Sequence, residues 1–291
     1  MTDYPVTLGV IGGSGVYEME GVDVVAEHNI DTPFGKPSDA IIEVKLEGRK
    51  AFFLPRHGKG HKLLPSEVNY RANVYALKSL GVSHVLAVSA VGIMKEDIHP
   101  GDMVVPDQIF DRSKGLRAST FFGDGVVGHV EFADPFDRDM CSWIAAAAKE
   151  AVGTVHEGGA YVCIEGPQFS TRAESRQYRD TLKPAVIGMT GIPEAKLVRE
   201  AEMCYGMLAL ATDYDCWKED GEDVNVEAVL AVLKANSENA KAIVRKLISR
   251  LPGTSNSPHL EAAKYAIITA RDAIPAKRRE ELGLLYGKYL G

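Results

Sequence analysis

The sequence has little cysteine, and what it has forms no metal-binding pattern. Its 291 residues include four cysteines, Cys141, Cys163, Cys204 and Cys216. They form no C-x-x-C pair and no cysteine–histidine spacing typical of zinc sites. This pattern fits reduced thiols in the cytoplasm. A disulfide between Cys204 and Cys216 is the alternative. The sequence therefore gives no indication of a metal centre.

Long apolar runs and basic clusters are also missing. No apolar run reaches the length that a bilayer requires. Residues 1–5 form no basic segment, and residues 6–11 are too short for a signal core. The net charge is -7, and no Lys/Arg cluster is interleaved with aromatic residues. We expect a cytoplasmic protein with no nucleic-acid or membrane partner.

Short apolar runs rich in Val, Ile and Ala alternate with helical patterns. A chain of this length, 45% hydrophobic, is long enough for one large domain or two smaller ones. The runs predict buried strands at 6–11, 51–54, 84–89, 103–106, 160–164, 185–189 and 207–211. Helical patterns cover 66–80, 137–152, 193–204 and 225–250. The alternation predicts an α/β fold with a mixed central sheet, in which ligands bind beyond the carboxyl ends of the strands.

A stretch rich in Pro, Ser and Asn, residues 251–258, separates this body from a helical tail. Such composition is typical of a connecting loop. We predict one domain over 1–250, and we interpret 251–291 as a linker and C-terminal helical extension of that domain.

Two carboxylates two residues apart follow the apolar run 207–210. In an extended strand, residues i and i+2 share a face, so Asp213 and Asp215 would converge on one point. Crowding raises the pKa of at least one of the two, which lets one donate a proton while the other accepts a hydrogen bond. The pair suits recognition of a small polar ring, and a solvated acidic loop is the alternative.

A glycine-rich turn follows the first run of apolar residues. In Gly12-Gly13-Ser14-Gly15, glycines let backbone N–H groups approach an anion, and the Ser14 hydroxyl is a further donor. The lysine of a Walker loop is absent, and Glu18 stands where the dinucleotide fingerprint needs its third glycine. A phosphate cradle is therefore favoured over a dinucleotide site, and a plain tight turn is the alternative.

Three other strand ends add groups that suit an anion. Arg56 and His57 follow the second run; an arginine fork matches phosphate, and an imidazole can add a donor. Ser89 and Thr190 place hydroxyls at two more strand ends. Each could be an ordinary turn or structural residue, but their recurrence after strands predicts a phosphate site.

Many segments in order resemble one enzyme family. They are 11–15, 31–38, 56–58, 65–73, 100–102, 164–175, 189–190, 193–194 and 211–217. Together they are similar to the trimeric purine nucleoside phosphorylase family, in its 5′-methylthioadenosine phosphorylase branch. The resemblance covers about residues 8–250 in unbroken order, and agreement over so many segments is far more specific than any single motif. The tail after Ser257 lies outside it.

The resemblance implies a reaction and an assembly. Inorganic phosphate would attack C1′ of the nucleoside as the purine leaves, giving adenine and 5-methylthioribose 1-phosphate in methionine and purine salvage. No metal or organic cofactor is implied, and the protein would be a homotrimer. The implied phosphate contacts are Ser14, Arg56, His57, Ser89, Ala90 and Thr190.

The resemblance also assigns the nucleoside contacts. Phe169 would lie against the purine and Met189 against the ribose. Protonated Asp213 would donate to purine N7 as the glycosidic bond breaks. Asp215 would accept from the 6-amino group, because an ionised carboxylate repels a 6-oxo group.

Recognition of the 5′ group would involve two subunits. His129 would reach it from the adjacent subunit. Val226, Val229 and Leu230 would form an apolar wall for the methylthio group, although their i, i+3, i+4 spacing also fits a buried helix stripe.

Two departures from the family pattern leave alternatives open. Gly188 stands where some members have Asn, and the tail is longer. A phosphorylase of adenosine, inosine or 5′-methylthioinosine is therefore the first alternative. A non-catalytic nucleoside-binding protein is the second, but sensing a nucleoside does not require the phosphate-binding residues that accompany Asp213.

Overall fold

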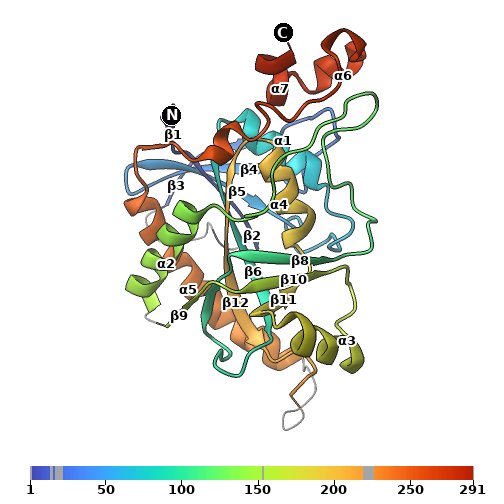
Figure 1. Cartoon of the computed structure of the whole chain (residues 1–291). Coiled ribbons are helices and arrows are strands. Elements are labelled where there is room, and N and C mark those ends of the chain that lie inside the picture. The colour runs from blue at the N-terminus through green and yellow to red at the C-terminus, as the bar shows by residue number, and fades with distance from the viewer. Residues whose placement is uncertain (1, 14–15, 17–21, 153, 219–225, 291) are drawn as a thin grey trace.

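A mixed sheet crosses the middle of the molecule, and helices cover both of its faces (Figure 1). The computed structural model describes residues 2–13, 16, 22–152, 154–218 and 226–290, with the backbone alone for 226–231 and 233. The predicted α/β fold with a mixed central sheet is confirmed. Among the described residues, no helix has the length and apolar character needed to cross a membrane.

The strands and helices alternate over most of the chain. The strands are β1 (Tyr4–Pro5), β2 (Leu8–Gly12), β3 (Asp23–His28), β4 (Ile41–Leu46), β5 (Arg49–Pro55), β6 (His84–Ile93), β7 (Met103–Val105), β8 (Gln108–Arg112), β9 (Val155–Glu157), β10 (Ala160–Ile164), β11 (Val186–Gly188), β12 (Cys204–Asp213) and β13 (Thr254–Ser255). The helices are α1 (Tyr70–Ser79), α2 (Arg138–Val152), α3 (Arg172–Gln177), α4 (Gly191–Glu200), α5 (Val226–Arg250), α6 (Ala276–Glu281) and α7 (Gly283–Leu290). A π-helical turn, Tyr178–Leu182, continues α3, and 3₁₀ turns span Pro258–Glu261 and Arg271–Ala273.

The long strand β6 organises the sheet. It pairs in parallel with β12 along one edge, and with β2 along the start of the other. The β2 pairing ends at Ile11↔Ala87, and β11 joins the same edge in antiparallel orientation only at Ile187↔Gly92. The edge of β6 between Ala87 and Gly92 therefore has no strand partner among the described residues. This gap is where the cavity described below opens.

Successive side chains of β6 enter two different cores. Val85 and Ala87 pack with residues of α1, α4 and α7, whereas Leu86 and Val88 pack with residues of α2 and α5. This alternation follows from the two-residue period of a strand. A strand buried on both faces is expected to be apolar throughout, which explains why the sequence revealed it.

Several predicted bounds were wrong. The helix predicted over 66–80 begins at Tyr70, because the Asn69 side chain caps it by accepting a hydrogen bond from the Ala72 amide. The helix predicted over 193–204 ends at Glu200. Glu202 then adopts a left-handed conformation (φ 54°), and Cys204 starts β12.

Strands β1, β3, β4, β8, β9 and β13 were not predicted. Two of them, β3 and β8, are mostly exposed or half-buried, so their sequences lack the apolar run that marks a central strand. All four cysteine thiols are free, so the Cys204–Cys216 disulfide that the sequence left open is not formed.

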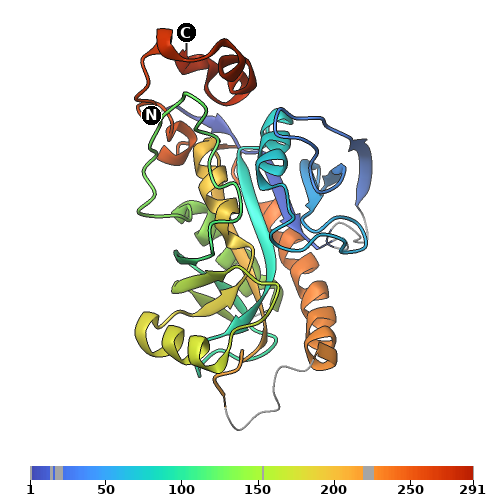
Figure 2. The same cartoon turned by 90° about the vertical axis from the view of Figure 1, so that its right-hand side faces the viewer.

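The C-terminal segment lies at the same end of the molecule as the N-terminus (Figure 2). Glu202, which is 1% exposed, holds it through one carboxylate. Its Oε1 accepts hydrogen bonds from the Ala263 amide (3.0 Å) and the Tyr289 hydroxyl (2.6 Å), and the Lys288 ammonium lies 2.7 Å from Oε2. These contacts agree with the interpretation of 251–291 as an extension, and the division at residue 250 stays a prediction.

Glu200 at the end of α4 is a buried acid that makes stability depend on pH. Its carboxylate accepts hydrogen bonds from the Thr120 hydroxyl and the Phe121 amide, and burial raises its pKa from 4.5 to about 7. A pKa raised on folding gives stability that is complete below pH 4.5 and is lost as pH rises through 7. This pKa shift corresponds to a loss of about 3 kcal/mol of unfolding free energy.

We predict that the difference in unfolding free energy between the wild type and Glu200→Gln falls as pH rises from 4.5 to 8. The amide cannot ionise, so the variant lacks this loss. Urea denaturation of both proteins at several pH values measures it. A difference that stays constant or grows over this range would contradict the assignment.

Candidate active site

A cavity of about 540 Å³ opens beyond the carboxyl ends of the central strands. This is the expected place for a ligand in such a fold, and the volume lies in the usual range for small-molecule sites. The lining groups come from six strands or the residues that follow them, and from helix α5. They include Gly13, Arg56, His57, His61, Ser89, Ala90, Gly92, Phe169, Gly188, Met189, Thr190, Thr212, Asp213, Asp215, Ser237 and Ala240.

The gap in the β6 ladder forms one end of the cavity. The Ser89 and Thr190 hydroxyl oxygens lie 3.1 Å apart across it. The carbonyl of Val88 faces the gap, because it accepts a hydrogen bond from Arg56. Ala90, two residues further along the strand, turns its backbone the same way. Two hydroxyls and an unpaired strand edge therefore surround a space suited to an anion.

Arg56 lies beneath this end and is bound by protein groups. Its Nε and Nη2 bind the two carboxylate oxygens of Glu194 at 2.9 and 3.1 Å, with both side chains 1–2% exposed. Nη1 donates to the Val88 carbonyl and Nη2 to the Ile11 carbonyl. One Nη1 hydrogen has no partner among the described residues. The arginine fork therefore binds Glu194, and at most a single N–H is free for an anion.

His57, next to Arg56 in the chain, lines the cavity with one ring nitrogen engaged. Its Nδ1 lies 2.8 Å from the Leu63 carbonyl oxygen, and its ring stacks on His61 with centroids 4.5 Å apart. Burial and the neighbouring Arg56 charge lower the pKa of His57 to about 4, so the ring is neutral near pH 7.

The two predicted acids reach the other end of the cavity by a different geometry from the expected one. Asp213 is the last residue of β12, and the chain then turns, with Asp215 in a left-handed conformation (φ 52°). The Asp215 amide donates to Asp213 Oδ1 at 2.9 Å, and the Thr212 hydroxyl lies 2.6 Å from Asp213 Oδ2. The prediction that Asp213 and Asp215 share one face of a strand was wrong, but both acids line the cavity.

Asp215 lines the cavity and lies against two serine hydroxyls. Burial raises the pKa of Asp215, and the Asp213 charge adds to the rise, while the side chains of Ser175 and Ser170 and the Cys216 amide lower it. The serine hydroxyls therefore favour the ionised carboxylate. This end of the cavity offers hydrogen-bond acceptors to a ligand.

The sequence analysis missed a buried pair that supports the site. Arg117 Nε binds Glu165 Oε1 at 2.9 Å, and its Nη1 donates to the carbonyls of Met189 and Ile192. Met189 and Thr190 are thereby fixed at the end of β11. Glu165 and Glu194 both lie in segments that supported the family resemblance, yet no pattern in the sequence pairs an acid with an arginine so far along the chain.

The remaining predicted residues fall into three groups. Phe169 is 56% exposed and, like Met189, lines the cavity, so Phe169 is not a core residue. His129 is exposed and is not among the residues that line this cavity. Ser14 and the side chains of Val226, Val229 and Leu230 lie outside the described residues.

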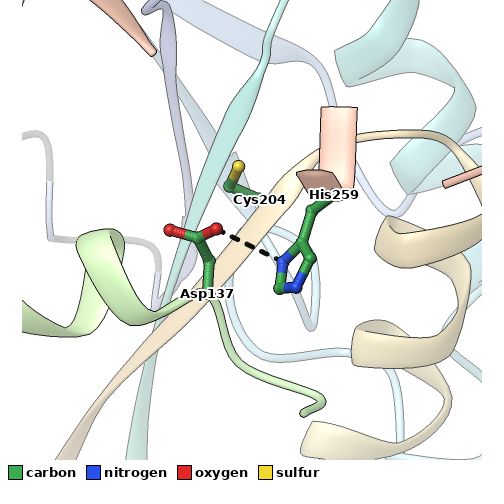
Figure 3. A group of neighbouring side chains, drawn as sticks. All are labelled: Asp137, Cys204 and His259. Carbon is green, nitrogen blue, oxygen red and sulfur yellow. Dashed lines mark ion pairs between the residues drawn. The ribbon is translucent and has the colours of Figure 1, made fainter. Parts of the chain in front are cut away.

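A second polar cluster, Asp137, Cys204 and His259, lies apart from the cavity (Figure 3). Its donor set would suit a soft divalent metal, but its atoms are engaged. Asp137 accepts from the Met140 amide and the Ser257 hydroxyl, and the Arg199 guanidinium donates to the His259 ring. Burial also raises the pKa of the Cys204 thiol. The cluster joins the start of the C-terminal segment to α2 and β12.

We predict that Glu194→Gln costs about 3–5 kcal/mol of unfolding free energy, the usual effect of breaking a buried ion pair. The amide would leave the Arg56 charge buried without a counter-ion. Tyr205→Phe is the matched control, because it removes only the 2.9 Å hydrogen bond from the Tyr205 hydroxyl to Glu194, worth about 1.5–3 kcal/mol. Urea denaturation measures the unfolding free energy of both variants. Equal losses relative to the wild type would argue against a dominant contribution from the ion pair.

Comparison with known proteins finds relatives that match most of the chain. Residues 7–249 match the family described as the Phosphorylase superfamily. The S-methyl-5′-thioadenosine phosphorylase of Geobacter sulfurreducens is 56% identical over 283 residues, covering 97% of this chain and 99% of the relative. That of Koribacter versatilis is 49% identical over 98% of this chain and 97% of the relative.

Solved structures agree as well. A methylthioadenosine phosphorylase from an antarctic soil metagenomic library superposes with a TM-score of 0.90 at 44% identity, covering 97% of this chain and 99% of that one. The Schistosoma mansoni methylthioadenosine phosphorylase in complex with adenine gives 0.79 at 38% identity, covering 84% of this chain and 91% of that one.

These matches correct one expectation and confirm another. The match to the Geobacter protein covers 97% of this chain, so it must include part of the tail after Ser257. The prediction that this tail lies outside the resemblance was therefore wrong. The resemblance itself is confirmed, and with a match over most of its length the chain belongs to the phosphorylase superfamily.

Proposed function

We propose that this protein catalyses the phosphorolysis of S-methyl-5′-thioadenosine to adenine and 5-methylthio-α-D-ribose 1-phosphate. One observation supports this activity above the others: the same cavity has the hydroxyls of Ser89 and Thr190 in its lining together with the acids Asp213 and Asp215. Ser89 and Gly92, which lies against the acids, are three residues apart on β6, or about 10 Å at 3.3 Å per residue. This spacing suits a ribose held between phosphate and purine.

In this proposal each end has a role in bond breaking. A phosphate oxygen, held near Ser89, Ala90 and Thr190, attacks C1′ of the ribose while the C1′–N9 bond breaks. The bonding electrons pass to the purine, and Asp213 donates a proton to N7 so that the base leaves neutral. The proton lost by phosphate and the one regained by Asp213 exchange with water.

The acidic end favours adenine over 6-oxopurines. Asp215 lines this end of the cavity, and its carboxylate would accept a hydrogen bond from the 6-amino group of adenine. A 6-oxo group would place two acceptors face to face. Phe169, exposed at the rim, would cover the purine.

The other assignments follow from the family and belong to the same proposal. Ser14 would add a phosphate contact, and Val226, Val229 and Leu230 would face the methylthio group. His129, which does not line this chain's own cavity, would reach the 5′ group of a neighbouring subunit in a homotrimer. Phosphate would be the only co-substrate, without metal or organic cofactor, and the enzyme would act in the cytoplasm in methionine and purine salvage.

The test of this function is adenine release from S-methyl-5′-thioadenosine with and without inorganic phosphate, beside adenosine, inosine and 5′-methylthioinosine. Phosphate-dependent release that is fastest with S-methyl-5′-thioadenosine supports the proposal. Preference for the inosine-type substrates would overturn the base assignment, and tight nucleoside binding without turnover would indicate a binding protein.

We predict that Asp213→Asn lowers kcat for S-methyl-5′-thioadenosine by tens- to thousand-fold, the usual effect of removing a general acid. Asparagine preserves the shape of the side chain, so nucleoside binding measured by calorimetry should change much less. An unaltered kcat would remove Asp213 from this role.

We predict that Asp215→Asn narrows the preference for 6-amino over 6-oxo substrates by about tenfold or more, measured as the ratio of kcat/KM values. An amide can present either a carbonyl or an amino group to the base, whereas an ionised carboxylate only accepts. A ratio equal to that of the wild type would show that Asp215 does not read position 6.

A further inference from the structure

The imidazole of His57 is held in one tautomer by its own loop. The Leu63 carbonyl, 2.8 Å from Nδ1, can only accept a hydrogen bond, so Nδ1 must be the protonated nitrogen. In a neutral ring the other nitrogen, Nε2, is then an acceptor. The sequence suggested that this imidazole would donate to an anion, and the tautomer reverses that role.

The surroundings of His57 keep the ring neutral. The charged and titratable groups around it are Arg56 next to it in the chain, His61 stacked on its face, and Arg117. All three oppose a positive charge, as does burial, and only the hydrogen bond to Leu63 favours one. The resulting pKa of about 4 leaves the ring uncharged at neutral pH.

Left-handed residues fix the loop that sets this tautomer. Gly58 (φ 73°), Gly60 (φ 82°) and His61 (φ 54°) reverse the chain, and the Lys62 and Leu63 amides both donate to the His57 carbonyl. The turn therefore brings Leu63 back beside His57, where the loop begins. Glycine adopts such conformations at little cost, so the glycines of this loop serve the orientation of the histidine.

From this geometry we propose that His57 Nε2 accepts a hydrogen bond from a protonated oxygen of the bound anion, so that the site selects oxyanions that carry an OH group. The inference rests on the proposed phosphorolysis. Inorganic phosphate and arsenate carry a proton near neutral pH, whereas sulfate, of the same shape, carries none. Sulfate would place an oxygen lone pair against the Nε2 lone pair, an unfavourable contact in a buried site.

The charge of the site supports the same selection. Glu194 neutralises Arg56, so the described residues here offer hydroxyls, amides and one arginine N–H but no unpaired fixed cation. Attraction by charge alone would hold phosphate and sulfate about equally. Discrimination must then come from hydrogen-bond direction. A hydroxyl can turn a donor or an acceptor to the anion, whereas the bare Nε2 of His57 can only accept.

The test measures anion competition in the whole enzyme. Adenine release from S-methyl-5′-thioadenosine is followed with phosphate or arsenate as co-substrate and sulfate as inhibitor, from pH 5.5 to 8. For the wild type at pH 7.5, we expect the inhibition constant of sulfate to exceed the KM of phosphate at least about tenfold. Sulfate inhibition should strengthen by up to about tenfold for each pH unit of acidification, since a protonated His57 becomes a donor.

His57→Asn is the informative variant. Its amide can turn either a donor or an acceptor to the anion, so the preference for phosphate over sulfate and the pH dependence of sulfate inhibition should both be lost. His99→Asn, the same change at a histidine 66% exposed and outside the cavity, should leave both unchanged. Because the readout is a ratio and a pH profile, a general loss of activity does not imitate it.

A spectroscopic measurement gives an independent answer. Imidazole ¹⁵N shifts at pH 7, assigned by comparison with His57→Asn, should show His57 with Nδ1 protonated and Nε2 bare. A ring with Nε2 protonated, or sulfate inhibition as strong as phosphate binding and independent of pH, would overturn the proposal. If instead no phosphate-dependent release of adenine occurs, the proposed function itself fails, and the ¹⁵N result still decides the tautomer.

Discussion

The site depends on a discontinuity in the hydrogen-bond ladder of β6. Strand β2 leaves its edge after Ala87 and β11 joins only at Gly92, so the intervening backbone has no strand partner among the described residues. Unpaired strand backbone is costly unless another group binds it. Arg56 binds the first carbonyl of the gap, and the cavity receives the rest. A side chain at Gly92, where β11 joins, would meet Ile187 at 2.9 Å and approach Asp213 and Asp215, so a glycine at the end of the gap leaves room for the acids.

The gap would not hold an anion alone, and the way that charge is distributed around it follows from burial. A buried guanidinium needs a counter-ion, and Glu194 provides it by binding both Nε and Nη2. This pairing leaves the described residues at this end without an unpaired arginine charge. In the proposed function, hydroxyls, amides and a neutral imidazole would hold the anion, and the directions of their hydrogen bonds would decide which anion fits.

Sequence reasoning located the cavity but not the supports behind it. Strand ends are visible as apolar runs followed by Gly, Ser, Thr or Asp, and these gave Ser89, Thr190 and Asp213 correctly as groups that line the cavity. The same reasoning expected Asp215 on a continued strand, because the turn at residues 214–216 has no Gly or Pro to mark it. The sequence analysis assigned the Arg56 guanidinium to phosphate. Its actual partner, Glu194, is 138 residues away in the chain, and only the tertiary structure brings the two together.

At the acidic end, burial and hydrogen bonds act on Asp215 in opposite directions. Burial raises the pKa of its carboxyl, while the side chains of Ser175 and Ser170 and the Cys216 amide lower it. In the proposed function, a ligand that offers a donor to this carboxylate would replace the water that burial removes, and a ligand that offers only an acceptor would not. The proposed preference for an amino-bearing ring therefore depends on a carboxylate that the fold holds at the end of the buried strand β12.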